Sequence, residues 1–445
     1  MYYTHKVVDF IKNLKYEEIP MKVIQHLKLC ILDILGVSLA GSVTKASKIA
    51  ANFALDYFGS GNSTLINNPS KSTCIGAAWA NSVMASTLDM DDGHNYAMGH
   101  PGAVIIPGTL ALAESNGIRG EKVIEAILAG YEVSIRIAGS RVPSYIHTYA
   151  TGPWGVYAAA IAAAKLLDLD KESIIHTIGI AGSHGPARPH SKEYEFVPMI
   201  KECIGWAGMT GISSAILAKK GFTAFRNFLD YDEFFNGPAL IKDLGEKYRF
   251  IETWFKPYSS CRWTHSSIDC VLELIQRYQI KEEEIEKINI YSFERASLMG
   301  SKKPKTLETA QYSIPFCIGA AVHYGKVGPE EISEKTLNNP RILEVADKVN
   351  ILFDPGMEEL FGKKLPAAVE IQTKRGLFKT RVDSPKGDLV NPMTKEDIHI
   401  KFEQLTSNIL GNKKLKEVML SVENFEKLNE IRCVMEDLKQ EKSVN

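Results

Sequence analysis

Apolar residues recur at helical spacing through most of the first 250 positions. Steps of three and four residues, typical of a packed helix, separate Val23, Leu27, Ile31, Ile34 and Leu35. We expect this helix to begin after Pro20 and to be capped at its carboxyl end by Gly41. Similar patterns predict helices over residues 75–88, 104–114, 120–141, 155–167 and 205–219. Alanine and glycine are dense in them, which favours helices packed at close distance.

The pattern changes near residue 255. Period-two alternation over residues 288–291 and 369–373 predicts half-buried strands, interspersed with helical segments such as Ile314–Tyr324. The tail, residues 395–410 and 415–438, returns to amphipathic helix. We therefore predict a mainly α protein. A large all-α helical domain comprises residues 1–253 and 393–445, and a smaller α+β lid domain comprises residues 254–392.

Composition and charge narrow the class of partner. The chain carries 52 Lys and Arg against 53 Asp and Glu, so it lacks the basic field that nucleic-acid binding needs. Its apolar runs fall short of the roughly 20 residues that span a bilayer, and the charged N-terminus lacks a signal-peptide core. The seven cysteines include no C-x-x-C pair, which disfavours zinc and iron–sulfur sites. We expect a cytoplasmic protein without nucleic-acid or membrane partners.

The richest segment for chemistry lies between two apolar helices. It contains Asp89, Asp91, Asp92, His94 and His100. Titratable groups held against a core are expected to have shifted pKa values, which suits acid–base catalysis. Two alternatives stay open. The segment could be a solvated turn that caps the next helix, or Asp89, Asp91, Asp92 and His94 could bind the metal ion of a hydrolase.

Three further segments carry candidate groups. Residues 256–265 lie at the predicted domain boundary, where clefts tend to form, and Lys256 and Arg262 suit a carboxylate; an interdomain salt bridge is the alternative. His147 precedes a Gly-containing turn, and a structural histidine is the alternative. Lys201 lies near a predicted helix start, where a positive charge opposes the helix dipole. This unfavourable position makes it a candidate site residue, and an ion pair with Glu202 is the alternative. The chain contains no Gly-rich phosphate loop and no G-x-S-x-G motif.

Taken in order, these segments resemble the MmgE/PrpD family, which includes 2-methylcitrate dehydratase, cis-aconitate decarboxylase and iminodisuccinate epimerase. The resemblance is carried by residues 29–41, 100–114, 120–138, 201–224, 256–269, 310–325 and 386–402. It implies a large helical domain built from both chain ends, a smaller lid, a homodimer, and no requirement for a metal or another cofactor. It does not identify the substrate.

The resemblance also implies a set of site residues. Asp89 takes the place of the first aspartate of the family's acidic motif, His100 that of its HPG histidine, and Lys256 that of the lysine in its KPY motif. The resemblance likewise carries over His147, Lys201, Arg262 and His265. With Tyr149 added, the candidate catalytic residues are Asp89, His100, His147, Tyr149, Lys201 and Lys256. The candidate substrate-binding residues are Arg262 and His265, together with Asp92 and His94 of the acidic segment.

The reactions of such a family create negative charge on a carbon next to a carboxylate. We hypothesise that Lys201, Lys256 and Arg262 bind substrate carboxylates. His100 and a second group, His147 or Tyr149, would move protons, and Asp89 would orient an imidazole or share a proton. A lyase that dehydrates a small di- or tricarboxylic acid is the favoured function. Epimerisation of an aspartate-like dicarboxylate, decarboxylation, the metal-dependent hydrolase and a non-catalytic helical scaffold are the alternatives.

Overall fold

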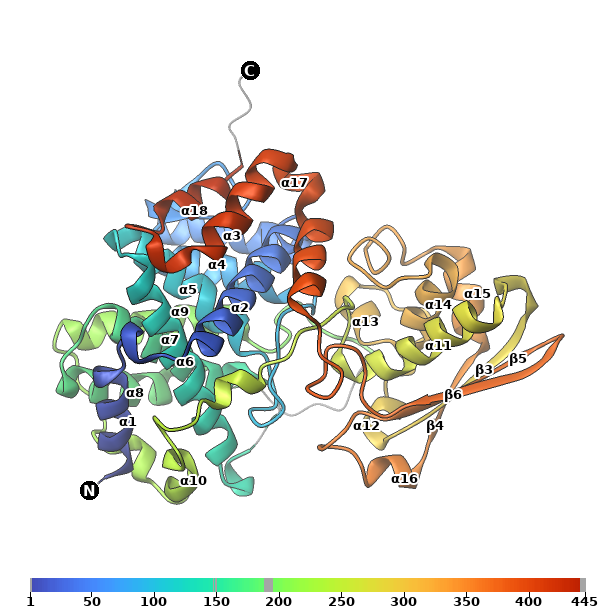
Figure 1. Cartoon of the computed structure of the whole chain (residues 1–445), viewed down its shortest axis with the longest axis horizontal. Coiled ribbons are helices and arrows are strands. Elements are labelled where there is room, and N and C mark those ends of the chain that lie inside the picture. Colours follow the sequence, from blue (N-terminus) through green and yellow to red (C-terminus); the bar gives the residue numbers. More distant parts are fainter. Residues whose placement is uncertain (1, 147, 149, 188–194, 441–445) are drawn as a thin grey trace.

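The computed structural model describes residues 2–146, 148, 150–187 and 195–440. Two lobes lie side by side in Figure 1, and the chain passes between them twice. The chain first passes from the larger to the smaller lobe after the helices of its amino-terminal half. It then returns to the larger lobe in α17, which packs against α2. Both chain ends therefore belong to the larger lobe.

The larger lobe is almost entirely helical. Its helices are α1 (Tyr3–Asn13), α2 (Met21–Gly41), α3 (Lys45–Phe58), α4 (Cys74–Ser86), α5 (Pro101–Asn116), α6 (Gly120–Ser140), α7 (Gly152–Leu166), α8 (Lys171–His184), α9 (Ile204–Lys219), α10 (Gly237–Ile241), α17 (Lys395–Glu423) and α18 (Arg432–Asp437). A short antiparallel pair, β1 (Ser60–Thr64) and β2 (Lys71–Ser72), departs from the all-α expectation for this region. It follows Gly59, whose φ of 71° ends α3.

Small residues explain how the central helices approach one another. Helix α7 packs against α5, α6, α8 and α9. A Cβ atom on Gly211 in α9 would come within 2.6 Å of the Ala159 side chain in α7. The prediction that Gly41 caps the carboxyl end of α2 is wrong, because the capping residue is Ser42. Gly41 is the last residue of α2, and a Cβ there would lie 2.1 Å from the carbonyl oxygen of Met84, so this glycine permits close packing of α2 on α4.

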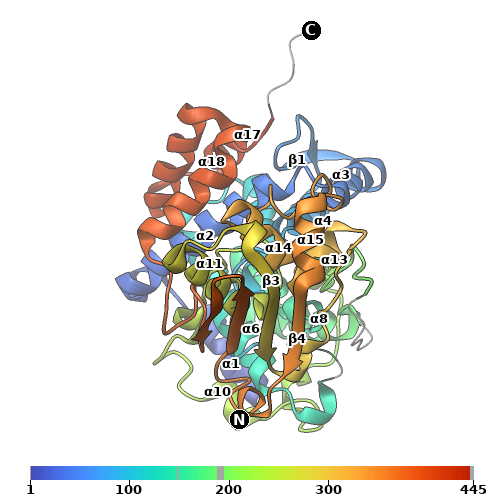
Figure 2. The same ribbon diagram turned by 90° about the vertical axis from the view of Figure 1, so that its right-hand side faces the viewer.

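The smaller lobe combines a mixed sheet with helices. Its strands β3 (Ile285–Ser292), β4 (Val349–Phe353), β5 (Ala367–Thr373) and β6 (Gly376–Val382) lie in the order β4-β3-β5-β6. Strand β3 runs parallel to β4 and antiparallel to β5, which is antiparallel to β6. The helices are α11 (His265–Tyr278), α12 (Glu294–Ser297), α13 (Leu307–Gln311), α14 (Ile314–Tyr324), α15 (Pro340–Lys348) and α16 (Pro355–Glu358). Figure 2 shows the sheet in front of α11 and α14.

Buried apolar residues form two separate clusters, one for each lobe. The first draws on residues 7–255 and 398–438, and the second on residues 268–371. The predicted boundary at 392/393 lies between these clusters, whereas the predicted boundary at 253/254 falls just before Phe255, which belongs to the first cluster. Both boundaries stay a prediction. The expectation of a mainly α protein with a smaller α+β domain is confirmed.

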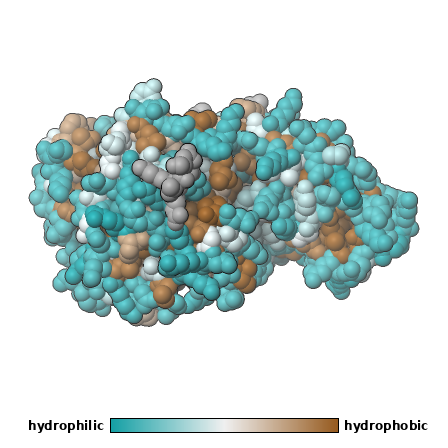
Figure 3. Space-filling view, turned by 90° about the horizontal axis from the view of Figure 1, so that it is seen from above, coloured by the Kyte–Doolittle hydropathy of each residue, from teal (hydrophilic) through white to brown (hydrophobic). Residues whose placement is uncertain are grey.

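The surface in Figure 3 is mainly hydrophilic, with scattered apolar patches. Among the helices of the described ranges, α2 alone is long and apolar enough to cross a membrane by length and composition. Of its most apolar stretch, 78% is buried inside the protein, as in a core helix.

Candidate active site

A cavity of about 240 Å³ lies where the two lobes meet. Its wall in the larger lobe includes Asp89, His94, His100, Thr148, Glu202 and Trp254. Its wall in the smaller lobe includes Cys261, Arg262, Arg295, Tyr312, the segment 361–365 and Asp388. The cavity therefore joins the acidic segment to residues that follow it by 100 to 300 positions in the sequence.

The acidic segment, residues 89–100, lies in the loop between α4 and α5. The interdomain segment, residues 254–265, holds it in place. Gly93 and Trp254 exchange two backbone hydrogen bonds of 2.9 Å. A Cβ on Gly93 would come within 2.3 Å of the Trp254 ring, so only glycine lets the indole lie directly on the loop. Asp89 adopts a φ of 54°, an uncommon conformation for a non-glycine residue that is found often at functional sites.

Asp89 lies at the junction of the lobes, paired with two lysines. Its Oδ1 is 2.5 Å from Lys256 Nζ, and its Oδ2 is 3.5 Å from Lys201 Nζ. Burial favours the neutral acid, but the charges of Lys201 and Lys256 outweigh it and hold the pKa of Asp89 far below its ordinary value. Asp89 is therefore a carboxylate at every physiological pH.

The two lysines, which the sequence suggested as groups that bind substrate carboxylates, lie behind the cavity wall. Lys256 is fully buried, Lys201 is nearly so, and neither belongs to the cavity wall. Lys201 Nζ also donates to the carbonyl oxygen of Ser86 and to Gln311 Oε1 at 2.9 Å. The expectation that both lysines bind substrate directly is not met in this conformation, because their charges are directed at Asp89. Lys201 pairs with Asp89 rather than with its neighbour Glu202.

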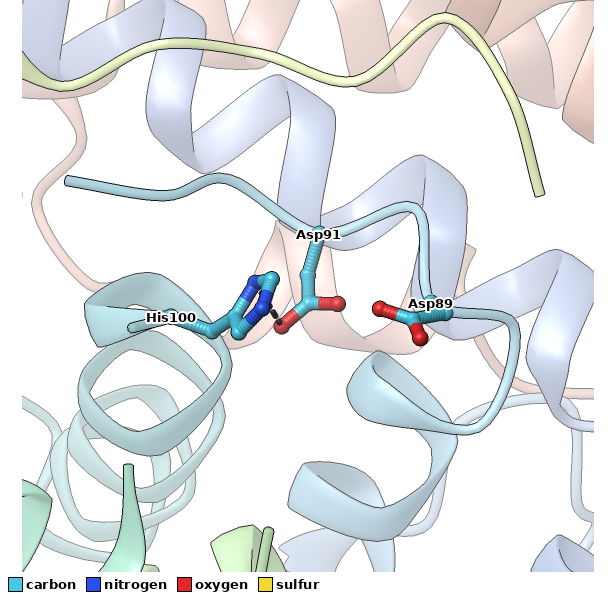
Figure 4. A group of neighbouring side chains, drawn as sticks. All are labelled: Asp89, Asp91 and His100. Atoms are coloured by element: carbon cyan, nitrogen blue, oxygen red, sulfur yellow. Dashed lines mark ion pairs between the residues drawn. The ribbon is translucent and has the colours of Figure 1, made fainter. Parts of the chain in front are cut away.

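His100 precedes α5 and lines the cavity. Its Nδ1 is 2.9 Å from the carbonyl oxygen of Asp92 and 3.6 Å from Asp91 Oδ2. Figure 4 shows the Asp91 carboxylate between His100 and Asp89. Burial alone would lower the pKa of His100, but the carboxylates of Asp91 and Glu202 outweigh it, so the pKa is raised. The raised pKa favours the protonated imidazole, the form that serves as a general acid.

Asp92 and His94, predicted to bind substrate, make internal contacts instead. Asp92 is fully buried; it accepts hydrogen bonds from the Gly102 amide (2.8 Å) and the Tyr131 hydroxyl (2.6 Å), and so caps α5. Burial raises the pKa of Asp92 to about 7. His94 lines the cavity, but its Nε2 lies 3.0 Å from the Arg249 carbonyl oxygen, and burial lowers its pKa to about 4. His94 is therefore a neutral residue that fixes the loop.

Arg262 and His265 occupy different depths of the smaller lobe. The Arg262 guanidinium lines the cavity, 4.4 Å from the centre of the Trp254 ring and 3.3 Å from Asp388 Oδ2. Burial lowers the pKa of Arg262 to about 10, so it stays charged. His265 is fully buried beneath it, with Nδ1 3.2 Å from Arg262 Nη1, and burial holds its pKa well below the ordinary value. His265 thus supports Arg262 from below and does not reach the cavity.

Two predicted catalytic residues, His147 and Tyr149, lie outside the described residues. Sequence reasoning also missed residues that the cavity wall includes, above all Glu202 and Tyr312. Glu202 follows Lys201, and Tyr312 lies in a segment that carries the family resemblance. Their sequence context pointed to the right segments but not to the side chains that face the cavity.

The proposed metal site has the wrong neighbours. Asp89, Asp91 and His100 offer ligand atoms within 4.8 Å of one another, but Asp92 and His94 of the predicted set point elsewhere. Two ammonium groups already neutralise Asp89, and the Nδ1 of His100 faces a carbonyl oxygen, which requires a proton on that nitrogen. The donor set therefore does not fit a cation.

Comparisons with known proteins cover nearly the whole chain. The MmgE/PrpD N-terminal domain matches residues 5–237, and the MmgE/PrpD C-terminal domain matches residues 258–427. The human cis-aconitate decarboxylase is 24% identical over 96% of this chain and 92% of its own length. A cis-aconitate decarboxylase of Aspergillus terreus is 23% identical over 97% and 95%, and a cis-aconitate decarboxylase-like protein of Aspergillus oryzae is 22% identical over 95% and 94%. With both of its domains matched in order and the predicted two-lobed fold present, the chain belongs to the MmgE/PrpD family.

Proposed function

We propose that this protein is a cofactor-independent lyase that acts on a small di- or tricarboxylate, by proton transfer at a carbon next to a carboxylate. The family and the relatives support an enzyme of the lyase class. The observation that carries the proposal is the cavity itself, which both His100, whose pKa is raised, and the Arg262 guanidinium line. An acid beside a cationic group that suits an anion supports the proposal.

Arg262 is the recognition group in this proposal. Its planar guanidinium can bind a carboxylate with two hydrogen bonds, and its contacts with Trp254 and Asp388 fix its orientation. Arg295, Lys363 and Lys364 add cationic groups on the same wall. A substrate with two or three carboxylates would thus be held by the smaller lobe with its reacting carbon towards the larger one.

His100 is the proton donor in this proposal. In a decarboxylation, the bond between carbon and the departing carboxylate breaks, carbon dioxide leaves, and the electron pair stays on carbon. The Nε2 proton of His100 then forms the new carbon–hydrogen bond, and water restores the proton to the imidazole. Such a placed acid contributes about 10²–10⁴ in rate. This reaction needs one acid, which the described residues supply.

Dehydration, the reaction favoured from the sequence, is the second candidate. It needs a base that removes the carbon-bound proton as well as an acid for the leaving hydroxyl. His94, although unprotonated at neutral pH, has its Nε2 next to the Arg249 carbonyl oxygen and its Nδ1 3.4 Å from the Ala97 amide. Because both ring nitrogens of His94 are occupied, His94 does not supply this base. The assignment of His147 or Tyr149 as the second group stays a prediction. Epimerisation, which needs groups on both faces of the carbon, stays a prediction too.

Product analysis tests the proposal. The purified protein is incubated with cis-aconitate, citrate, methylcitrate, malate and aspartate in deuterium oxide, and the products are followed by NMR. We expect carbon dioxide release with one deuterium on the former carboxylate-bearing carbon, unchanged after dialysis against a chelator. Loss of water would favour dehydration, and deuterium uptake without loss of either would favour epimerisation. Absence of turnover and of any thermal shift with every acid would contradict the proposal.

A further inference from the structure

His100 lies between two carboxylates that face its two ring nitrogens. Asp91 Oδ2 is 3.6 Å from Nδ1, and Glu202 Oε1 is 3.8 Å from Nε2. Asp91 belongs to the same loop as His100, whereas Glu202 comes from the turn before α9. The ring therefore has an anion at each end, and the second of these anions belongs to the cavity wall.

The contacts of Nδ1 determine which proton is transferable. A carbonyl oxygen only accepts hydrogen bonds, so the 2.9 Å contact with the Asp92 carbonyl requires a proton on Nδ1. A neutral ring would then have a bare Nε2, and its lone pair would face the Glu202 carboxylate. Two electron-rich groups at 3.8 Å repel, whereas an Nε2 proton turns the same contact into attraction. Glu202 thus favours the form of His100 that carries a proton on the nitrogen towards the cavity.

Glu202 is itself held firmly for this purpose. Its Oε2 accepts hydrogen bonds from the Thr151 amide at 2.9 Å and from the Thr151 hydroxyl. The same hydroxyl oxygen accepts from the His100 amide at 2.9 Å, so Thr151 joins the two residues. Lys201 and Cys203 on either side of Glu202 both have positive φ, 43° and 61°. These contacts satisfy Oε2 and leave Oε1 directed at the imidazole.

We propose that Glu202 is a positioning residue that keeps the transferable proton on Nε2 of His100. The inference rests on the proposed function, in which His100 is the acid. The distance of 3.8 Å is too long for a hydrogen bond, so the proton is stabilised there without being committed to Glu202 and stays available to a substrate atom in the cavity. The raised pKa of His100 agrees with this arrangement.

Other charged groups act on the same imidazole. Asp91 and Asp89 from the loop favour the protonated ring, and Lys256 from the interdomain segment opposes it. Lys256 is paired with Asp89 at 2.5 Å, so these two charges largely offset each other at His100. Among the described residues, Asp91 and Glu202 are left as the groups that decide its protonation. Of these two, Glu202 alone faces the nitrogen on the cavity side.

The test is the Glu202→Gln variant, with the His100 titration followed by NMR of histidine labelled at Cε1. The His100 signal is assigned by its loss in a His100→Gln variant. We expect the pKa of His100 to fall by about one unit when the charge is removed. The pKa that defines the alkaline limb of the pH–rate profile should fall by the same amount. At pH values above this pKa, kcat should be about tenfold lower than in the wild type, and at lower pH it should change little.

Two companion variants sharpen this test. Asp388→Asn also removes a carboxylate from the cavity wall but does not contact His100, and it should leave the pKa of His100 unchanged. Glu202→Asp keeps the charge at a greater distance and should shift the pKa less than Glu202→Gln does; it provides the readout if the glutamine variant does not fold. A pKa of His100 equal in the wild type and both Glu202 variants would overturn the inference, and so would a loss of kcat that is uniform across pH.

The titration also separates this inference from the proposed function. It requires no substrate, so a shifted pKa in a protein that turns over no carboxylate would support the coupling of Glu202 with His100 while contradicting the lyase proposal. Turnover by the wild type together with an unshifted pKa in the variants would support the lyase proposal and contradict the coupling of Glu202 with His100.

Discussion

Lys256 and Asp89 form an ion pair of 2.5 Å across the junction between the lobes, with Lys256 fully buried. Lys201 approaches the second oxygen of the same carboxylate at 3.5 Å. The two positive charges are therefore directed at Asp89, which lines the cavity. Lys256 also links the segment that leads into the smaller lobe to the loop that carries His100.

A double-mutant cycle tests the coupling of Lys256 with Asp89. Lys256→Met leaves a buried carboxylate with one cation, and we expect it to lower the free energy of unfolding by about 3–5 kcal/mol. The double variant Asp89→Asn/Lys256→Met should lose less than the sum of the two single losses, because neither charge is then left unpaired. Chemical denaturation measures all four proteins. Additive losses would show that the pair does not act as a unit.

Replacing Arg262 should weaken the binding of substrate. Arg262→Lys keeps the charge but removes the planar fork, and we expect KM to rise about tenfold or more with a smaller change in kcat. Lys364→Ala is the matched control, because Lys364 is a cation of the same wall that pairs with Asp383 at 3.1 Å. Its effect on KM should be smaller. Equal KM values for the two variants would contradict the assigned role of Arg262.

Asp92 predicts a dependence of stability on pH. Its pKa is about 7 in the folded protein against roughly 3.9 when unfolded, so the folded state binds this proton more tightly. The stabilisation is fully present below pH 4 and is lost as the pH rises to 7. Asp92→Asn cannot ionise, so its stability relative to the wild type should increase between pH 4 and 7, by roughly 4 kcal/mol at most. Denaturation at several pH values checks the slope, and a constant difference would contradict it.

Local patterns were enough to predict the fold. Helical spacing placed α14 at Ile314–Tyr324 as the structure has it, and period-two alternation found parts of β3 and β5. Gly41 was misread because a glycine near a helix end has the same sequence signal whether it caps the helix or admits a neighbour. The close carbonyl of Met84 belongs to a helix more than 40 residues away, which local patterns do not reveal.

The candidate site was predictable in part for the same reason. Asp89 and His100 stood out because titratable groups lay between two apolar helices, and both line the cavity. Lys256 was assigned to the substrate because its sequence could not show that Asp89 lies closer. Glu202 was passed over since its relation to His100 depends on Thr151 and a turn far along the chain.

If His100 donates a proton to the reacting carbon, replacing its imidazole should remove most of the turnover. Turnover of the carboxylate that the product analysis identifies is compared between the wild type and His100→Gln, with the fold checked by circular dichroism. We expect kcat to fall by a factor of at least about 10² with little change in the circular dichroism spectrum. A folded His100→Gln protein that retains nearly full turnover would contradict this role of His100.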